Sequence, residues 1–183
     1  HRAAELITSF KQVAIDQTSS QRRVFILAEV IAKIITTLRP TLKKTPYNIE
    51  TSIPEIIQMD SFPGPLGQVL ANLINNAVIH AFEGKTQGTV RIEASQCEDK
   101  QVELKITDDG QGIPPANINR IFDPFFTTKL GQGGSGLGLS IANTIVTGIL
   151  GGTISVASEI GVGTTFTLKL PNIAPIANTN GND

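Results

Sequence analysis

The spacing of apolar residues changes along the chain between a helical period and a strand-like period, which predicts an α+β fold. Residues 21–42, 63–82 and 136–150 carry apolar side chains every three or four positions, so each is predicted to form an amphipathic helix. Pro40 disfavours continuation of the first of these helices, because proline lacks the backbone N–H that a continuing helix uses. Residues 1–20 show the same spacing less regularly and predict a further helix.

Alternation of apolar and polar residues predicts two pairs of strands in one sheet. Residues 88–95 and 101–107 are predicted to pair as an antiparallel hairpin, with Glu-Asp-Lys at its turn. Residues 153–158 and 164–170 are predicted to close the sheet as a second pair, around a turn that contains two glycines.

Three other segments complete the predicted elements. Residues 47–53 and 55–59 are expected to form short strands on either side of Pro54 and to pair as a hairpin. Residues 114–121 begin with two prolines and are expected to form a short helix. Residues 171–183 form a tail that has few groups to bury.

Composition adds limits to this picture. The 183 residues are 40% hydrophobic and 17% charged with a net charge of −1, which is typical of a globular domain and gives no positive field for nucleic acid. The single cysteine, Cys97, excludes an intrachain disulfide and is expected to be structural. No apolar run reaches the about 18 residues of a transmembrane helix, so no membrane contact is expected from this chain.

Three polar side chains on the predicted helix at 63–82 are candidates for binding a polar ligand. Asn72, Asn76 and His80 are spaced four residues apart and so form one column along a helix that is otherwise largely apolar. An asparagine oxygen is a neutral, hard ligand that suits a magnesium ion bound to phosphates. His80 fits a phosphate contact and an ordinary hydrogen-bonded surface histidine equally well.

Two turns that contain glycine are candidates for a nucleotide site. Asp108 ends the strand at 101–107 and is followed by Gly110 and Gly112, so its carboxylate can accept a hydrogen bond from an amino group such as that of adenine. Five glycines lie in residues 131–138, directly before a predicted helix. A glycine-rich loop at a helix N-terminus binds anions, because free N–H groups and the helix dipole point outward there.

Each turn has a simpler interpretation when it is taken alone. Asp-x-Gly-x-Gly is most often only a tight turn, and a glycine-rich loop is often a flexible connector. Together, at a separation of about 25 residues and with a strand before and a helix after, they favour nucleotide binding. The phosphate motif Gly-x-x-x-x-Gly-Lys-Ser/Thr is absent, and residues 124–129 are not the strand that a dinucleotide fold needs directly before its glycines.

The motifs in this order resemble the ATP-binding catalytic domain of sensor histidine kinases, within the wider family that includes DNA gyrase, Hsp90 and MutL. The resemblance covers roughly residues 24–171 and rests on five stretches of sequence. These stretches are Asn72-Leu73-Ile74-Asn75-Asn76-Ala77, Asp108 to Ile113, Ile121 to Phe126, Gly134 to Leu139, and Gly161-x-Gly163-Thr164-x-Phe166.

The resemblance implies a fold, a reaction and partners. The fold is expected to be a two-layer α/β sandwich, with helices on one face of a mixed, mostly antiparallel sheet. The implied reaction transfers the γ-phosphoryl group of Mg²⁺-bound ATP to a histidine, for relay to an aspartate of a response regulator. The implied partners are the phosphoacceptor helical hairpin of the same homodimeric kinase and the receiver domain of the regulator. A cytoplasmic location is implied, in a parent protein that an inner membrane could anchor.

The resemblance also assigns roles to individual residues. Asp108 is expected to bind the adenine amino group, Asn76 to hold Mg²⁺ and Asn72 to support the phosphates. ATPase relatives have a glutamate at the position of Asn72 that activates water, and an asparagine cannot accept that proton. The other expected nucleotide contacts are His80, Gly110, Gly112, Ile113, Phe122, Lys129, Gly134, Ser135, Gly136, Leu137, Gly138, Leu139 and Thr164.

The segment between the two glycine motifs is expected to include a mobile lid over the nucleotide. Residues 127–135 hold glycines, one lysine and one glutamine, a composition that allows movement on binding. Phe122, Phe125 and Phe126 precede the lid and serve either as a core anchor or as its hinge. Lys129 either reaches the γ-phosphate or is solvated.

The expected domain order is the end of a dimerisation hairpin at residues 1–22, an ATP-binding catalytic domain at 23–171 and a disordered tail at 172–183. His1 is not the expected phosphoacceptor, because no acidic residue follows it and the downstream proline of the acceptor motif is missing. No catalytic acceptor is therefore assigned within these residues, and the fragment is expected to bind Mg²⁺-ATP without phosphorylating itself.

Two other functions remain open at this point. One is a serine kinase of the anti-sigma-factor type, which the leading helix disfavours because those proteins begin near the sheet. The other is a non-catalytic nucleotide-binding module, which the intact motifs disfavour.

Overall fold

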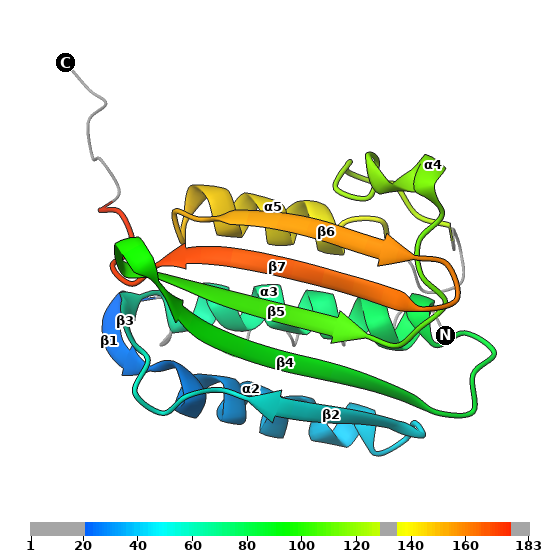
Figure 1. Ribbon diagram of the computed structural model, residues 1–183, viewed down its shortest axis with the longest axis horizontal. Helices are drawn as coiled ribbons and strands as arrows, with labels where there is room; N and C mark the ends of the chain where they lie inside the picture. Colours follow the sequence, from blue (N-terminus) through cyan, green and yellow to red (C-terminus); the bar gives the residue numbers. More distant parts are fainter. Residues whose placement is uncertain (1–20, 129–134, 177–183) are drawn as a thin grey trace.

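The structure is a computed structural model that describes residues 21–128 and 135–176, and it is a two-layer α/β sandwich (Figure 1). Its main layer is a five-stranded sheet in the order β2-β4-β5-β7-β6. The strands are β2 (Tyr47–Ser52), β4 (Gly88–Cys97), β5 (Gln101–Asp108), β6 (Thr153–Glu159) and β7 (Gly163–Pro171). Strand β2 runs parallel to β4 and the other neighbours are antiparallel, so the predicted fold class is confirmed.

Both predicted hairpins are present in the sheet. Strands β4 and β5 are joined by a short 3₁₀ turn at Glu98–Lys100, and β6 and β7 pair along their whole length. The register places Asp108 at the end of the central strand β5, opposite Val90 on β4 and opposite Thr164 on β7. Two polar residues, Asp108 and Thr164, are therefore side by side at one end of the sheet.

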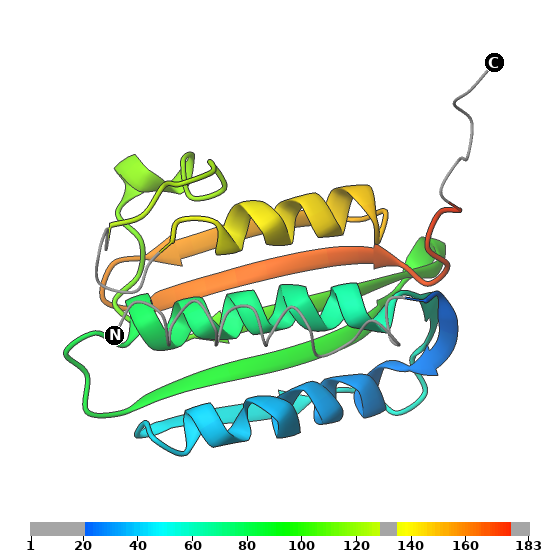
Figure 2. The same ribbon diagram turned by 180° about the vertical axis from the view of Figure 1, so that it is seen from behind.

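The second layer consists of α2 (Leu27–Leu42), α3 (Pro63–Asn76) and α5 (Gly138–Gly148), which lie together on one face of the sheet (Figure 2). Helix α3 lies between the other two and contacts both. The apolar stripe predicted for it is buried in the core and consists of Leu66, Val69, Leu70, Leu73, Ile74 and Ala77. After Asn76 the helix continues as a wider π-helical turn, Ala77–Ala81, so the helix predicted at 63–82 is confirmed with a different last turn.

Two shorter predictions are confirmed with changed bounds. The helix after Pro114 is one turn, α4 (Pro115–Ile118), rather than a segment that reaches residue 121. Helix α5 ends at Gly148, and Gly151 follows with a φ of 72°, a left-handed conformation that suits glycine and turns the chain into β6.

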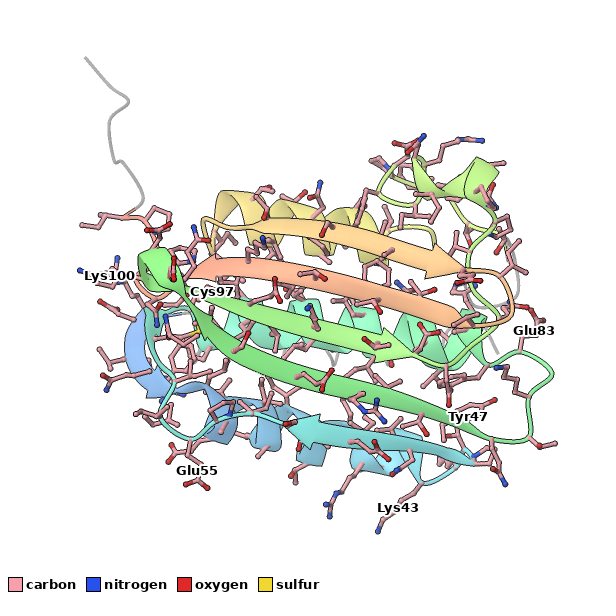
Figure 3. All side chains as sticks on the ribbon, viewed as in Figure 1. Lys43, Tyr47, Glu55, Glu83, Cys97 and Lys100 are labelled. Carbon is pink, nitrogen blue, oxygen red and sulfur yellow. The ribbon has the colours of Figure 1, made fainter. Side chains whose placement is uncertain are left out.

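The opposite face of the sheet is polar. Figure 3 shows side chains standing on the face that the helices leave uncovered, and charged residues alternate there with the buried apolar positions of the same strands. Lys105 pairs with Glu103 at 2.8 Å, and Arg91 pairs with Glu50 at 3.1 Å. Because this face carries charge and the helical face carries the core, the sheet is covered on one side only.

The prediction for residues 21–42 was wrong at its start and right at its end, Leu42. Residues Arg23–Ile26 form a strand, β1, and the helix begins only at Leu27. The helix then continues past Pro40 to Leu42. Pro40 lies in the last turn, where few helical residues follow, so its missing N–H interrupts little of the helix.

The predicted hairpin of residues 47–59 was also wrong. Strand β3 (Gln58–Ser61) pairs with β1, whereas β2 pairs with β4. The reason lies at Ile57, which is buried and accepts a hydrogen bond from the backbone nitrogen of Leu27 at 2.9 Å. This contact directs the chain toward β1 instead of back along β2.

The residues after β7 continue the fold. The backbone nitrogen of Asp60 donates to the carbonyl of Asn172 at 2.7 Å, and the nitrogen of Ala174 donates to the carbonyl of Asp60 at 2.9 Å. Ala174 is buried. The domain therefore extends beyond the predicted end at residue 171, while residues 177–183 lie outside the described part of the chain.

Residues 1–20, predicted to belong to a dimerisation helix, also lie outside the described residues, as do residues 129–134 of the predicted lid. Within residues 21–128 and 135–176, no helix has both the length and the apolar character that crossing a membrane requires.

Candidate functional site

A cavity of about 260 Å³ lies where α3, the end of β5 and the start of α5 meet. Its walls come from segments far apart in the sequence, namely the last turns of the α3 region, the loop after Asp108, and the loop that leads into α5. Most of the residues predicted as nucleotide contacts line it. These are Asn72, Asn76, His80, Asp108, Gly112, Ile113, Ser135, Gly136, Gly138, Leu139 and Thr164.

Some predicted contacts are placed differently. Gly110 donates its backbone N–H to Oδ1 of Asp108, and the rings of Phe122 and Phe166 pack in a T-shaped arrangement at a centroid distance of 6.4 Å. Neither Gly110 nor Phe122 is in the wall of the cavity, and neither is Leu137. Lys129 and Gly134 lie outside the described residues.

Asp108 is a buried carboxylate at the end of β5, with 8% of its surface exposed. Its Oδ1 accepts hydrogen bonds from the backbone nitrogens of Gly110 at 2.9 Å and Thr164 at 3.3 Å. Burial raises the pKa of this carboxyl above its usual range, and the two backbone hydrogen bonds offset only part of that rise. Since Oδ1 is occupied on both sides, Oδ2 is the oxygen left to accept a hydrogen bond from a ligand.

The three polar residues of the predicted column, Asn72, Asn76 and His80, make different contacts. Asn72 Nδ2 donates to the carbonyl of Gly138 at 3.1 Å and so connects α3 to the first residue of α5. Asn76 Nδ2 is buried and, among the described residues, has no hydrogen-bond acceptor. A buried amide without a partner costs free energy that a ligand can recover.

His80 reaches the cavity from the π-helical turn. Phe82 N donates to Ala77 O at 3.1 Å, which is the bond over five residues that defines a π-helical turn. The side chain of Gln111 donates to the carbonyl of His80 at 2.7 Å. The sequence predicted the column but not the wider turn, because no residue pattern in this stretch distinguishes the two helix types.

The glycines of the two motifs are required mainly by protein contacts. Gly112 has a φ of 76°, and a side chain there would collide with the backbone of Glu159. Gly136 has a φ of 68°, and a side chain there would collide with the backbone of Phe125. Both glycines have the positive φ that glycine allows and let the backbone of another loop approach closely, and both also line the cavity.

The phenylalanine motif holds the base of the predicted lid. The backbone nitrogen of Phe125 donates to the carbonyl of Gly136 at 2.8 Å, which joins the residues on either side of segment 127–135. Phe125 itself has a φ of 65° and is largely exposed, so its side chain is not a core anchor. Phe126 lines the cavity, and the guanidinium of Arg120 lies 4.7 Å from the centre of its ring.

Several cavity residues were not predicted. Three of them lie within the five motif stretches named above, so each position of those stretches was a candidate; they are Asn75, Gln111 and Phe166. Asn117, on α4, and Ile79, on the π-helical turn, have no comparable signal in the sequence. Their positions depend on how α4 and the π-helical turn fold around the cavity.

Comparison with known proteins gives a consistent assignment. Residues 63–173 match the family described as histidine kinase-, DNA gyrase B-, and HSP90-like ATPase. The sensor histidine kinase ZraS of Salmonella typhimurium is 46% identical over 118 residues, which are 64% of this chain and 24% of ZraS. The sensor histidine kinase RcsC of the same organism is 31% identical over 173 residues, which are 90% of this chain and 17% of RcsC.

The fold has a matching solved structure. The catalytic domain of histidine kinase ThkA superposes with a TM-score of 0.73 at 29% identity, over 84% of this chain and 97% of that domain. This chain spans about a quarter or less of the length of ZraS and RcsC, so the similarity concerns one part of those proteins.

Proposed function

The chain belongs to the histidine kinase-, DNA gyrase B- and HSP90-like ATPase family, and from that premise we propose that its domain donates the γ-phosphoryl group of Mg²⁺-bound ATP to a histidine. The observation that carries the proposal is the meeting of Asp108 and Asn76 in one cavity. Asp108 offers a carboxylate oxygen to a base, and Asn76 offers an unpartnered amide N–H donor to a phosphate oxygen, while its amide oxygen is the atom that would suit a metal ion.

The residues of the cavity fit ATP with Mg²⁺. Asp108 would hold the adenine amino group, and the amide of Asn76 would face the metal and phosphate end. The first residues of α5 present free backbone N–H groups, which suit phosphate oxygens. When bound, Mg²⁺ neutralises charge on the phosphates, and phosphoryl transfer then depends mostly on positioning.

Asn72 favours transfer to another group over hydrolysis. Its side-chain amide has no basic group that could accept a proton from water. Its nitrogen donates to Gly138, so the side chain connects α3 to α5. This arrangement supports a domain that holds ATP in place for an acceptor supplied from elsewhere.

The acceptor and the later partner are proposed by analogy with the relatives. ZraS and RcsC are named sensor histidine kinases, and this chain corresponds to a fraction of each. We place the acceptor histidine on a helical hairpin of the same homodimeric kinase and the next acceptor, an aspartate, on a response regulator. An ATP-dependent domain of this kind would work in the cytoplasm, where ATP is available.

Two measurements test the proposal. Calorimetric titration with a nonhydrolysable ATP analogue and Mg²⁺ should show binding, and absence of binding would favour a non-catalytic module. Radiolabelled ATP should then label a separately produced phosphoacceptor hairpin when this chain is added, but should not label the chain alone. The label should be lost in acid, as phosphohistidine is; an acid-stable label would identify a serine kinase instead.

A further inference from the structure

Ser158 lies on β6, just outside the cavity, and makes three hydrogen bonds that link separate parts of the wall. Its Oγ accepts from the backbone nitrogen of Ile113 at 2.8 Å and lies 2.9 Å from the carbonyl oxygen of Gly163. It also lies 2.8 Å from Oγ1 of Thr164. Ile113 and Thr164 both line the cavity.

The protons of this group of atoms can be assigned by counting donors. A serine hydroxyl has one hydrogen and two lone pairs. The carbonyl of Gly163 can only accept, so Ser158 gives its hydrogen to Gly163. The N–H of Ile113 can only donate, so it occupies one lone pair of Ser158. The remaining lone pair accepts the hydroxyl hydrogen of Thr164, which is the only direction that satisfies all three contacts.

This assignment determines what Thr164 offers to a ligand. Because its hydrogen is directed at Ser158, Thr164 Oγ1 presents only lone pairs to the cavity. Asp108, directly opposite in the register, also presents an acceptor through Oδ2, since Oδ1 is held by Gly110 and by Thr164 itself. The end of the cavity at β5 and β7 therefore carries two acceptors side by side.

We propose that Ser158 is a specificity-determining residue, which orients the hydroxyl of Thr164 as an acceptor and so makes the site select a 6-amino purine over a 6-oxo purine. This inference rests on the proposed binding of ATP. A 6-amino group supplies two hydrogens, one for each acceptor, whereas a 6-oxo group places a third acceptor against them and the single N1–H beside it can serve only one of them. Ser158 itself touches no ligand and acts through Thr164.

The test compares two nucleotides that differ at position 6 of the purine. Dissociation constants are measured for nonhydrolysable analogues of ATP and inosine triphosphate, each with Mg²⁺, on the unchanged chain and on Ser158→Ala. The unchanged chain should prefer the adenine analogue. In Ser158→Ala the hydroxyl of Thr164 is released and can donate into the cavity, so the preference should fall by roughly fivefold.

Matched variants separate this role from a structural one. Ser155→Ala, on the exposed face of the same strand, should leave the preference unchanged. Ser158→Cys keeps the side-chain volume but is a weak acceptor, so it should also lower the preference, which covers the case in which Ser158→Ala does not fold. In a Thr164→Val background, Ser158→Ala should have no further effect on the preference.

The outcomes are distinct. A loss of affinity in Ser158→Ala that is equal for both nucleotides would show a purely structural role and would overturn the inference while ATP binding stands. A preference that still falls in the Thr164→Val background would overturn it as well. If the unchanged chain bound neither nucleotide, the proposed function would fail together with this inference.

Discussion

Thr164 donates its backbone hydrogen to Oδ1 of Asp108, so the strand β7 determines which carboxylate oxygen faces the cavity. Gly110 donates to the same oxygen from the following turn. The side chain at position 108 is thus oriented by two donors that cannot accept, and this orientation gives the first prediction.

Asp108→Asn should reverse the polarity of the base site. The two backbone donors would hold the amide oxygen at the position of Oδ1 and turn the NH₂ group into the cavity, against the amino group of adenine. Affinity for the ATP analogue should fall roughly 10- to 100-fold, by calorimetry. Asp109→Asn, at the exposed neighbouring position, should bind nearly as the unchanged chain does. Equal affinity in Asp108→Asn would contradict the assigned role of the carboxylate.

The raised pKa of Asp108 predicts how the stability of the ligand-free domain changes with pH. The folded state binds this proton more tightly than the unfolded state, so the contribution of Asp108 to stability is highest below the ordinary aspartate pKa and falls as the pH rises through the raised value. The melting temperature of Asp108→Asn relative to the unchanged chain should therefore increase with pH across that window. A constant difference would show that burial of Asp108 does not shift its pKa.

Asn76→Ala should separate binding of phosphate from stability. Affinity for the Mg²⁺-ATP analogue should fall about tenfold, because the amide proposed to face the metal and phosphates is lost. Affinity for adenosine should not change. Since Nδ2 of Asn76 has no acceptor among the described residues, the melting temperature of the ligand-free chain should not decrease. A marked loss of thermal stability would assign Asn76 to the fold rather than to the ligand.

Gly136→Ala should destabilise the domain through a backbone collision. The added methyl group would meet the backbone of Phe125, at a φ of 68° that alanine rarely adopts. The free energy of unfolding should decrease by roughly 1–3 kcal/mol in chemical denaturation. Gly148→Ala is the control, because a methyl group at the end of α5 meets nothing within 4 Å and should be neutral or stabilising. Similar effects in both variants would argue against close contact between the two loops.

Truncation tests the extension of the domain beyond β7. A chain that ends at residue 171 loses three backbone hydrogen bonds, two to Asp60 and one from Asn172 to Lys100, together with the side-chain bonds of Asn172 and the buried side chain of Ala174. At about 1 kcal/mol for each backbone bond, its melting temperature should be lower by roughly 5–10 °C than that of a chain that ends at residue 176. If the two truncated chains melted together, the segment would contribute nothing to stability.

The parts of the fold that the sequence predicted are those governed by local patterns. The β4–β5 hairpin follows from alternation on both sides of a short turn, and Asp108 follows from its place at the end of that pattern. The parallel pairing of β2 with β4 has no such signal, because its partners are separated along the chain by α3 and are brought together by the core. Ile57 was predicted in a strand that pairs with residues 47–53, yet its carbonyl accepts from Leu27, next to the pairing of β1 with β3.

The residues of the candidate site also divide into those that belong to a short local motif and those that are placed by contacts between distant segments. Asn76 and Thr164 were found because each belongs to a short motif, and both line the cavity. Ser158 was not found, because its role depends on three hydrogen bonds to residues on either side of the cavity wall, and an isolated serine in a strand predicts none of them. Phe125 was expected either in the core or as a hinge, and only its left-handed backbone and its bond to Gly136 place it beside the lid.

Asp60 contacts both the first and the last residues of the described domain at one corner of the fold. Its carboxylate pairs with Arg22 at 2.8 Å, and its backbone forms hydrogen bonds with Asn172 and Ala174. That corner is at the opposite end of the sheet from Asp108 (Figure 1). Asp60 therefore ties the first and last segments of the described domain to each other. Loss of its side chain should loosen Arg22 at a distance from the cavity, while the backbone bonds to the last segment remain.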